Sequence, residues 1–140
     1  MGTPEIVLPL WVDALPSSYD IVTAYYPETK PKSELRLRPC LVVQVVEGED
    51  GAKACVVVFG TKHLKVAKRG HLDIIVGNAA DIAQFGLSMA TRFDLDSPVP
   101  LPWHPEAFGC WSGHSHPVIG SLSEPFIRDY AFKMLSRRSV

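Results

Sequence analysis

Hydrophobic and polar residues alternate in short runs along this chain, and these runs predict a mainly β fold. Short runs rich in β-branched and aromatic residues, bounded by glycine, proline or aspartate, are typical of strands. An Asp-Gly pair in the polar stretch 47–51 predicts a hairpin turn between two of the runs. The predicted strands are residues 20–26, 40–46, 54–59, 72–76 and 88–95, with 63–70 as a loop or a further edge strand.

Two segments have a helical pattern instead. Residues 78–85 predict a short helix, with Asn78 as its N-cap and Gly86 as its stop signal. Residues 123–138 predict a closing helix that begins at Ser123 and has its apolar residues on one face. Short strands joined by hairpins, with one closing helix, predict a small barrel rather than a parallel α/β sheet.

Two proline-rich segments lie outside these elements. Residues 1–18 contain three prolines and predict an extended N-terminal arm that packs on the domain. Residues 97–117 form a loop rich in Pro, Gly, Trp and His. Because long structureless loops are uncommon in compact domains, part of this loop is expected to be ordered against the body. The predicted organisation is an arm at 1–18 followed by a single barrel domain at 19–140.

The composition is that of one globular domain. The chain has 140 residues, of which 46% are hydrophobic and 21% charged, and this is enough apolar material for a core. No apolar run reaches the roughly 18 residues of a membrane-spanning helix, and the first ten residues lack a signal-peptide pattern. Two of the three cysteines, Cys40 and Cys55, lie inside apolar runs, as buried reduced thiols do. A cytoplasmic location without a membrane partner is therefore expected.

Positive charge is concentrated in one part of the chain. The formal net charge of −1 argues against a protein that coats nucleic acid by charge alone. Residues 30–71, however, contain nine Lys and Arg against four Asp and Glu. This segment is either a solvated basic face or a local anion-binding surface on an otherwise acidic protein.

Arg38 is the best-marked candidate for chemistry. It directly precedes Pro39, which favours an extended backbone, and it stands where a polar loop enters an apolar strand. Thr61 follows the next strand of the hairpin, so both residues are expected at the same end of the sheet. A guanidinium beside a hydroxyl suits a phosphate group. The structural alternative is that Arg38 forms a surface ion pair with Glu34 and that Thr61 caps a turn.

Several stretches resemble, in their order, the MazF/PemK toxin family. They are Asp20-Ile21-Val22, Ser33-Glu34, Arg38-Pro39 with the apolar run behind it, a strand ending in Thr61, Gly86-Leu87-Ser88, and residues 118–123 before the final helix. The resemblance covers roughly residues 19–135. It implies an SH3-like barrel of the MazF/PemK/CcdB type with a C-terminal helix, a homodimer, and metal-independent cleavage of single-stranded RNA.

The resemblance implies catalytic roles for Arg38 and Thr61. The RNA 2′-hydroxyl would attack the neighbouring phosphate, and Arg38 would hold the negative charge of the transition state. Because a guanidinium has a pKa above about 12, this electrostatic role comes before acid catalysis. Thr61 would orient a phosphate oxygen, and Glu34 is a candidate proton acceptor. The basic side chains expected to bind RNA are Lys32, Arg36, Lys62, His63 and Lys65.

The family resemblance also implies partners. These are single-stranded RNA and a small antitoxin protein whose acidic or apolar segment covers the RNA groove, and no cofactor is expected. The sequence departs from the family pattern at Lys62, where a serine commonly follows the family threonine, and in the longer loop 97–117. A rival interpretation is a binding module with the same barrel that recognises RNA or protein without catalysis. A purely structural dimer is a third.

Loop 97–117 contains further reactive and aromatic side chains. Four of them are potential zinc ligands: His104, Cys110, His114 and His116. Their spacing matches no usual structural zinc pattern, which favours solvated histidines and no metal site. Aromatic side chains here and in the first strand can stack on bases, although in a small barrel they more often belong to the core or a dimer interface. These aromatic residues are Tyr25, Tyr26, Trp103 and Trp111.

Overall fold

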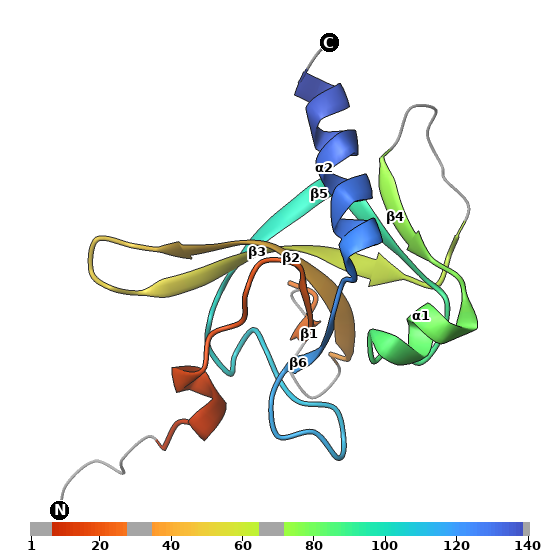
Figure 1. Ribbon diagram of the computed structural model, residues 1–140. Helices are drawn as coiled ribbons and strands as arrows, with labels where there is room; N and C mark the ends of the chain where they lie inside the picture. Colours follow the sequence, from red (N-terminus) through yellow and green to blue (C-terminus); the bar gives the residue numbers. More distant parts are fainter. Residues whose placement is uncertain (1–6, 28–34, 65–71, 139–140) are drawn as a thin grey trace, which may run out of the picture.

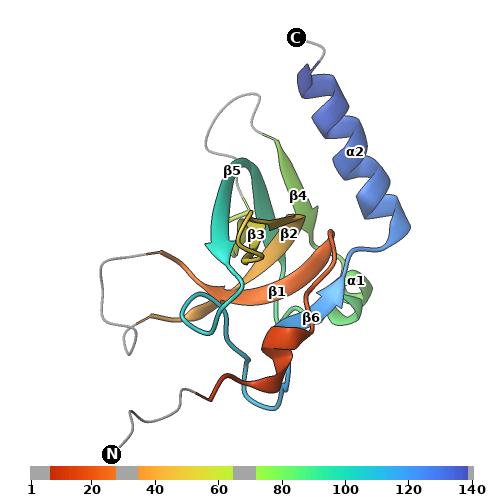
Figure 2. The ribbon, with the colours of Figure 1, turned by 90° about the vertical axis from the view of Figure 1, so that its left-hand side faces the viewer.

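A six-stranded antiparallel sheet forms the centre of the protein in this computed structural model, which describes residues 7–27, 35–64 and 72–138 (Figures 1 and 2). The strands are β1 (Asp20–Tyr25), β2 (Leu37–Glu47), β3 (Lys53–Thr61), β4 (Asp73–Val76), β5 (Thr91–Pro102) and β6 (Val118–Ser121), in the order β4-β5-β3-β2-β1-β6. The helices are a 3-10 turn η1 (Leu10–Asp13), α1 (Ala79–Gln84) and α2 (Glu124–Arg138). A mainly β fold with a C-terminal helix is thereby confirmed.

The sheet curls into a half-barrel instead of lying flat (Figure 2). The pairing register shifts between β1 and β6, between β2 and β3 after Val42, and between β3 and β5 after Val58. An extra residue on one strand of a pair bends that strand and increases its twist. The last of these shifts lies just before Gly60, so it sets the position of the end of β3.

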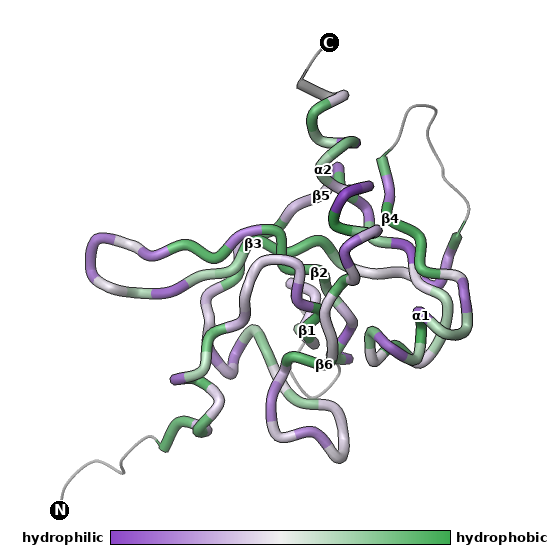
Figure 3. The backbone as a smooth tube through the Cα atoms, viewed as in Figure 1, coloured by the Kyte–Doolittle hydropathy of each residue, from purple (hydrophilic) through white to green (hydrophobic). Residues whose placement is uncertain are grey.

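β2 is buried on both faces, which explains its nearly continuous apolar run. Cys40, Leu41 and Val42 are all fully buried, and successive strand residues point to opposite sides of a sheet. Cys40 and Val42 pack in one hydrophobic cluster, and Leu41 packs in a second cluster on the other side. In Figure 3 the hairpin of β2 and β3 is hydrophobic where it crosses the centre and hydrophilic at its outer tip.

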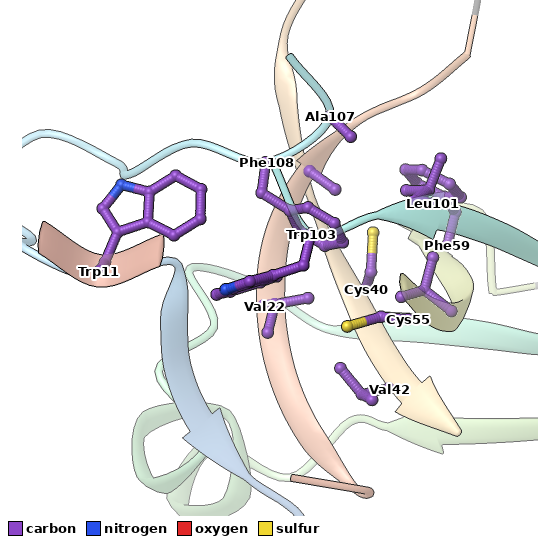
Figure 4. Close-up of a cluster of buried hydrophobic side chains, with 12 residues drawn as sticks. Trp11, Val22, Cys40, Val42, Cys55, Phe59, Leu101, Trp103, Ala107 and Phe108 are labelled. Carbon is purple, nitrogen blue, oxygen red and sulfur yellow. The ribbon is translucent and has the colours of Figure 1, made fainter. Parts of the chain in front are cut away.

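The first cluster contains two tryptophans and ties the N-terminal arm to the sheet (Figure 4). The ring centroids of Trp11 and Trp103 are 4.9 Å apart in an edge-to-face arrangement. The indole N–H of Trp103 donates to the carbonyl oxygen of Val12 at 3.0 Å. The described part of the arm packs on the domain through Trp11, which lies in the η1 turn and not in an extended segment.

The second cluster is covered by α2. Phe126 and Tyr130 belong to the face of α2 that packs on this cluster, and the rings of Phe85 and Phe126 lie 5.2 Å apart. Both helix starts agree with the sequence: the side chain of Asn78 accepts from Ala80 N at 2.8 Å, and α2 begins directly after Ser123. Among the described residues, no helix is both long and apolar enough to cross a membrane.

β5 was predicted wrongly as residues 88–95, because it begins at Thr91 and continues to Pro102. Three prolines at alternate positions made the second half look like a loop. The N–H of Trp103 donates to Lys53 O on β3, so from residue 98 onward the even-numbered residues of β5 turn their nitrogens away from β3. The prolines occupy these outward positions: Pro98, Pro100 and Pro102. Among the described residues, β4 pairs with β5 along residues 91–94 alone, so the missing N–H groups interrupt no ladder in this part of the chain.

Candidate active site

Arg38 and Thr61 lie at the same end of the hairpin formed by β2 and β3, as their order in the sequence predicts. Cys40 pairs with Phe59, and Arg38 and Thr61 each lie two residues beyond that pair. Nη2 of Arg38 donates a hydrogen bond to the carbonyl oxygen of Gly60, 3.2 Å away. The guanidinium is therefore anchored to the backbone position directly before the threonine.

Two aromatic rings also contact the guanidinium of Arg38. Cζ of Arg38 lies 5.2 Å from the ring centroid of Tyr26 and 5.6 Å from that of Phe59. The backbone of Arg38 is paired with Ala24 of β1, so both ends of the residue are fixed. Within the described part of the chain, Gly60 accepts one of the five guanidinium N–H groups. The remaining donors are suited to a bidentate contact with a phosphate.

Two adjoining hollows open beside Arg38 and Thr61. The one of about 400 Å³ is called the larger hollow because its neighbour is smaller. Its walls come from the start of β2, the end of β3, residues 87–91 and Trp111. Three of its lining side chains, Arg36, Arg38 and Lys62, are cationic, and no described lining residue is Asp or Glu. The larger hollow is therefore a positively charged surface suited to an anion.

A smaller hollow of about 260 Å³ lies next to it. Arg38, Thr61 and His63 line both hollows. Tyr26 and Phe59, the two rings that flank the guanidinium, belong to the smaller hollow. A chain-like ligand that extends from one hollow into the other would pass these three shared residues, and Arg38 would meet it midway.

Arg92 fixes the segment that follows Thr61, and sequence reasoning missed it. Arg92 pairs with Thr61 across β5 and β3, and its Nε donates to the carbonyl oxygen of His63 at 2.8 Å. Nη1 of Arg92 forms an ion pair of 3.0 Å with Oδ1 of Asp73, and both side chains are largely buried. Oγ1 of Thr61 accepts from the backbone N–H of His63 at 3.2 Å. The signal available in the sequence was only the alternation within 88–95, which does not identify the partner strand.

The predicted RNA-binding residues divide into two groups. Arg36, Lys62 and His63 line the larger hollow, and all three are exposed. The other two predicted RNA-binding residues, Lys32 and Lys65, lie outside the described part of the chain. So does Glu34, the candidate proton acceptor and the alternative ion-pair partner of Arg38. The structure thus brings three predicted cationic or imidazole side chains to Arg38 and Thr61.

Trp111, one of the aromatic residues that the sequence suggested for base stacking, lines the larger hollow. Its indole N–H donates to the carbonyl oxygen of Leu37, the residue before Arg38, at 3.3 Å. Trp103, from the same loop, is instead buried in the first hydrophobic cluster. The sequence treats the two tryptophans alike, and only the path of the loop over β1 separates them. Residues 7–18 of the arm line neither hollow.

Two of the three histidine rings of loop 97–117, those of His104 and His116, are hydrogen-bonded to the backbone. Nδ1 of His104 accepts from Glu106 N. Nδ1 of His116 accepts from Val118 N at 2.9 Å, and its Nε2 lies 2.7 Å from Ala14 O. His116 therefore carries its proton on Nε2 and donates it to Ala14. Among the described residues, no three His, Cys, Asp or Glu side chains gather as metal ligands would.

The cysteine thiols are held in their protonated form. Burial raises the pKa of Cys40 well above its ordinary value, against a smaller opposite effect of Arg38. Burial also raises the pKa of Cys55 from 9.0 to about 11, and it raises that of Cys110. Because the thiolate is the nucleophilic form, a raised pKa makes these side chains poor nucleophiles. Among the described side chains that line the two hollows, the candidates for chemistry are therefore the guanidinium, hydroxyl and imidazole groups.

Comparison with known proteins finds no match, either among models of protein families or among curated proteins. The residues of the two hollows therefore carry the functional inference. Their arrangement places an anchored guanidinium, a hydroxyl and an imidazole where the cationic larger hollow meets the smaller one, whose lining also includes Asp94. Such a set can bind a phosphodiester and stabilise added negative charge on it.

Proposed function

We propose that this protein is a metal-independent endoribonuclease that cleaves single-stranded RNA. The observation that carries the proposal is the anchored Arg38 guanidinium, which lies beside Thr61 at the border of two hollows. Donors that are fixed before the reaction stabilise a developing charge more effectively than donors that must reorganise. Gly60, Tyr26 and Phe59 supply that fixation.

The proposed reaction is attack of a ribose 2′-hydroxyl on the adjacent phosphorus atom. A bond forms from the 2′-oxygen to phosphorus, and the bond to the 5′-oxygen of the next nucleotide breaks. The products are a 2′,3′-cyclic phosphate and a 5′-hydroxyl. Arg38 binds the phosphoryl oxygens as negative charge grows on them, and the Thr61 hydroxyl orients one of these oxygens.

Two side chains are candidates for accepting the 2′-hydroxyl proton. Glu34 is the candidate from the family resemblance. His63 lines both hollows next to Arg38 and Thr61, and an imidazole exchanges protons near neutral pH. The proton that is removed from the 2′-hydroxyl is balanced by the proton that the leaving 5′-oxygen gains.

The resemblance to the MazF/PemK family extends the proposal to fold type and biology. The curled sheet with its C-terminal helix is compatible with an SH3-like barrel of the MazF/PemK/CcdB type. In this proposal the protein is the toxin of a cytoplasmic toxin–antitoxin pair, forms a homodimer and is restrained by a small antitoxin protein. Induced expression of wild type in bacteria should then arrest growth, and expression of Arg38→Ala should not.

A catalytically silent module that binds RNA or protein is the competing function. One observation favours it: an exposed lysine, Lys62, follows Thr61 in the larger hollow where the family commonly has a serine. A lysine adds phosphate affinity without adding a hydroxyl for catalysis. The two functions share a binding surface, so they differ in turnover and not in affinity.

The decisive experiment measures cleavage of a fluorescent single-stranded RNA in the presence of EDTA. Wild type should produce fragments with cyclic phosphate and 5′-hydroxyl ends, and Arg38→Ala should be slower by roughly 100-fold or more. An RNA with one 2′-deoxy sugar at the cleaved position is the matched control and should stay intact. Equal cleavage by Arg38→Ala, or no cleavage by wild type, would overturn the assignment. Binding without cleavage would identify the silent module.

A further inference from the structure

The loop that carries Trp111 is built onto β1 as a fixed structure. Tyr25 N donates to Ala107 O at 2.8 Å, and Thr23 Oγ1 donates to Gly109 O. Ala24 forms a β-bridge with Phe108, which is fully buried. Several hydrogen bonds to one strand hold this part of the loop in place, so residues that follow Gly109 leave the sheet from a defined point.

Trp111 is in turn tied to the entry of β2. Its indole N–H donates to Leu37 O, which fixes one edge of the ring beside the residue before Arg38. Gly109 allows this close approach, because a Cβ there would lie 3.1 and 3.2 Å from the two Cδ atoms of Leu37. Trp111 lines the larger hollow together with Leu87 and Met89, and the ring centroid of His114 lies 6.4 Å from that of Trp111.

Trp111 has a different environment from the other two tryptophans of the chain. Trp11 and Trp103 are 7% and 6% exposed and pack against each other in the first cluster. Trp111 is half-buried and shares the larger hollow with Arg36, Arg38 and Lys62. An aromatic surface beside cations is the usual composition of a single-stranded nucleic-acid site, in which cations hold phosphates and rings stack on bases.

We propose that Trp111 stacks on a nucleobase of the RNA strand next to the phosphate that Arg38 binds. This inference rests on the proposed function and names a binding residue that the catalytic step does not require. Stacking is tolerant of base identity because every base has a π-face. Trp111 therefore contributes affinity and register along the strand. The alternative is that Trp111 only holds its loop against Leu37.

A DNA oligonucleotide tests the inference without catalysis, because it lacks the attacking 2′-hydroxyl. Titration of wild type with a fluorescein-labelled single strand at low salt should raise its anisotropy, and an unlabelled strand should quench tryptophan fluorescence. Trp111→Phe should retain affinity within about threefold but lose the quenching, because a phenyl ring still stacks. Trp111→Ala should lose roughly tenfold or more in affinity.

The outcomes separate this inference from the proposed function. Two results would overturn stacking and leave the proposed cleavage intact. One is tryptophan quenching that persists in Trp111→Phe. The other is unchanged DNA affinity in Trp111→Ala while Arg38→Ala binds DNA more weakly. Quenching lost in Trp111→Phe in a protein that never cleaves RNA supports stacking and overturns the nuclease. If wild type binds no DNA strand, stacking fails, and the RNA cleavage assay alone decides the nuclease. The Phe variant keeps the test decisive should Trp111→Ala fail to fold, which circular dichroism would reveal.

Discussion

Nη2 of Arg38 donates a hydrogen bond to the carbonyl oxygen of Gly60, and this contact joins the start of β2 to the end of β3. Gly60 is required at this point, since a Cβ there would lie 2.6 Å from Thr91 Cγ2 and 3.0 Å from Pro39 O. The close packing of β3 against β5 and β2 therefore sets where the guanidinium is held. It also sets the position of Thr61.

Replacing Tyr26 tests whether the aromatic contact places Arg38. Tyr26→Leu removes a cation–π partner at a partly exposed site, where such contacts contribute about 0.5–1 kcal/mol. RNA cleavage should fall by about 2- to 5-fold with unchanged thermal stability. Tyr26→Phe retains the ring and is the matched control. A larger loss in Tyr26→Phe than in Tyr26→Leu would assign the effect to the phenol hydroxyl and refute the cation–π role.

Substitutions of Thr61 separate its hydroxyl from its shape. Thr61→Ala removes the oxygen that accepts from His63 N and that orients phosphate in the proposed reaction, so the cleavage rate should fall by about 100-fold. Thr61→Ser keeps the oxygen and should remain within about tenfold of wild type. The measurement is single-turnover cleavage of a short RNA. Equal rates for the Ala and Ser variants would show that the hydroxyl plays no part.

The ion pair between Arg92 and Asp73 should be important for stability. Both side chains are largely buried, and removal of one partner leaves an uncompensated charge, at a cost of about 3–5 kcal/mol. Asp73→Asn should therefore lower the free energy of unfolding in urea by several kcal/mol. Glu124→Gln, which breaks the exposed pair with Arg128, is the control and should have little effect. Similar small changes in both variants would contradict this prediction.

Gly120 should not tolerate a side chain. A Cβ at this position would lie 2.2 Å from the carbonyl oxygen and 2.4 Å from the carbonyl carbon of Phe85, and backbone atoms cannot move aside cheaply. We expect Gly120→Ala to destabilise the protein by about 3 kcal/mol. At Gly77 a Cβ would meet nothing within 4 Å, so Gly77→Ala should change stability by less than about 0.5 kcal/mol. Urea unfolding of both variants gives the comparison.

The buried thiols predict a loss of stability at high pH. The folded pKa of Cys55 is about 11 and its ordinary value is 9.0. Between these values the unfolded chain has released the proton and the folded chain retains it. Ionisation of the Cys55 thiol should therefore leave the free energy of unfolding unchanged below about pH 9 and should lower it as pH rises to about 11. Urea midpoints measured from pH 8 to 11 should fall less steeply for Cys55→Ala than for wild type, and parallel slopes would count against the prediction.

Much of the secondary structure follows from local patterns. β1, the hairpin of β2 and β3, and both helices were predicted because alternation, an Asp-Gly turn and an Asn N-cap act over a few residues. β5 was predicted too short and β6 was not predicted as a strand. The alternating prolines of β5 can be recognised as compatible with a strand only when the side of β5 that faces β3 is known. β6 has four residues and depends on pairing with β1 from nearly a hundred positions away.

The candidate site likewise has a part that local sequence predicts and a part that depends on contacts between distant segments. The sequence by itself determined that Arg38 and Thr61 share one end of a hairpin, because antiparallel neighbours joined by a tight turn have their order set locally. Only the tertiary structure decided what surrounds them. Arg92 reaches His63 through the pairing of β5 with β3, and Trp111 reaches Leu37 because its loop is held on β1. These contacts span long stretches of chain, and side-chain type alone does not specify them.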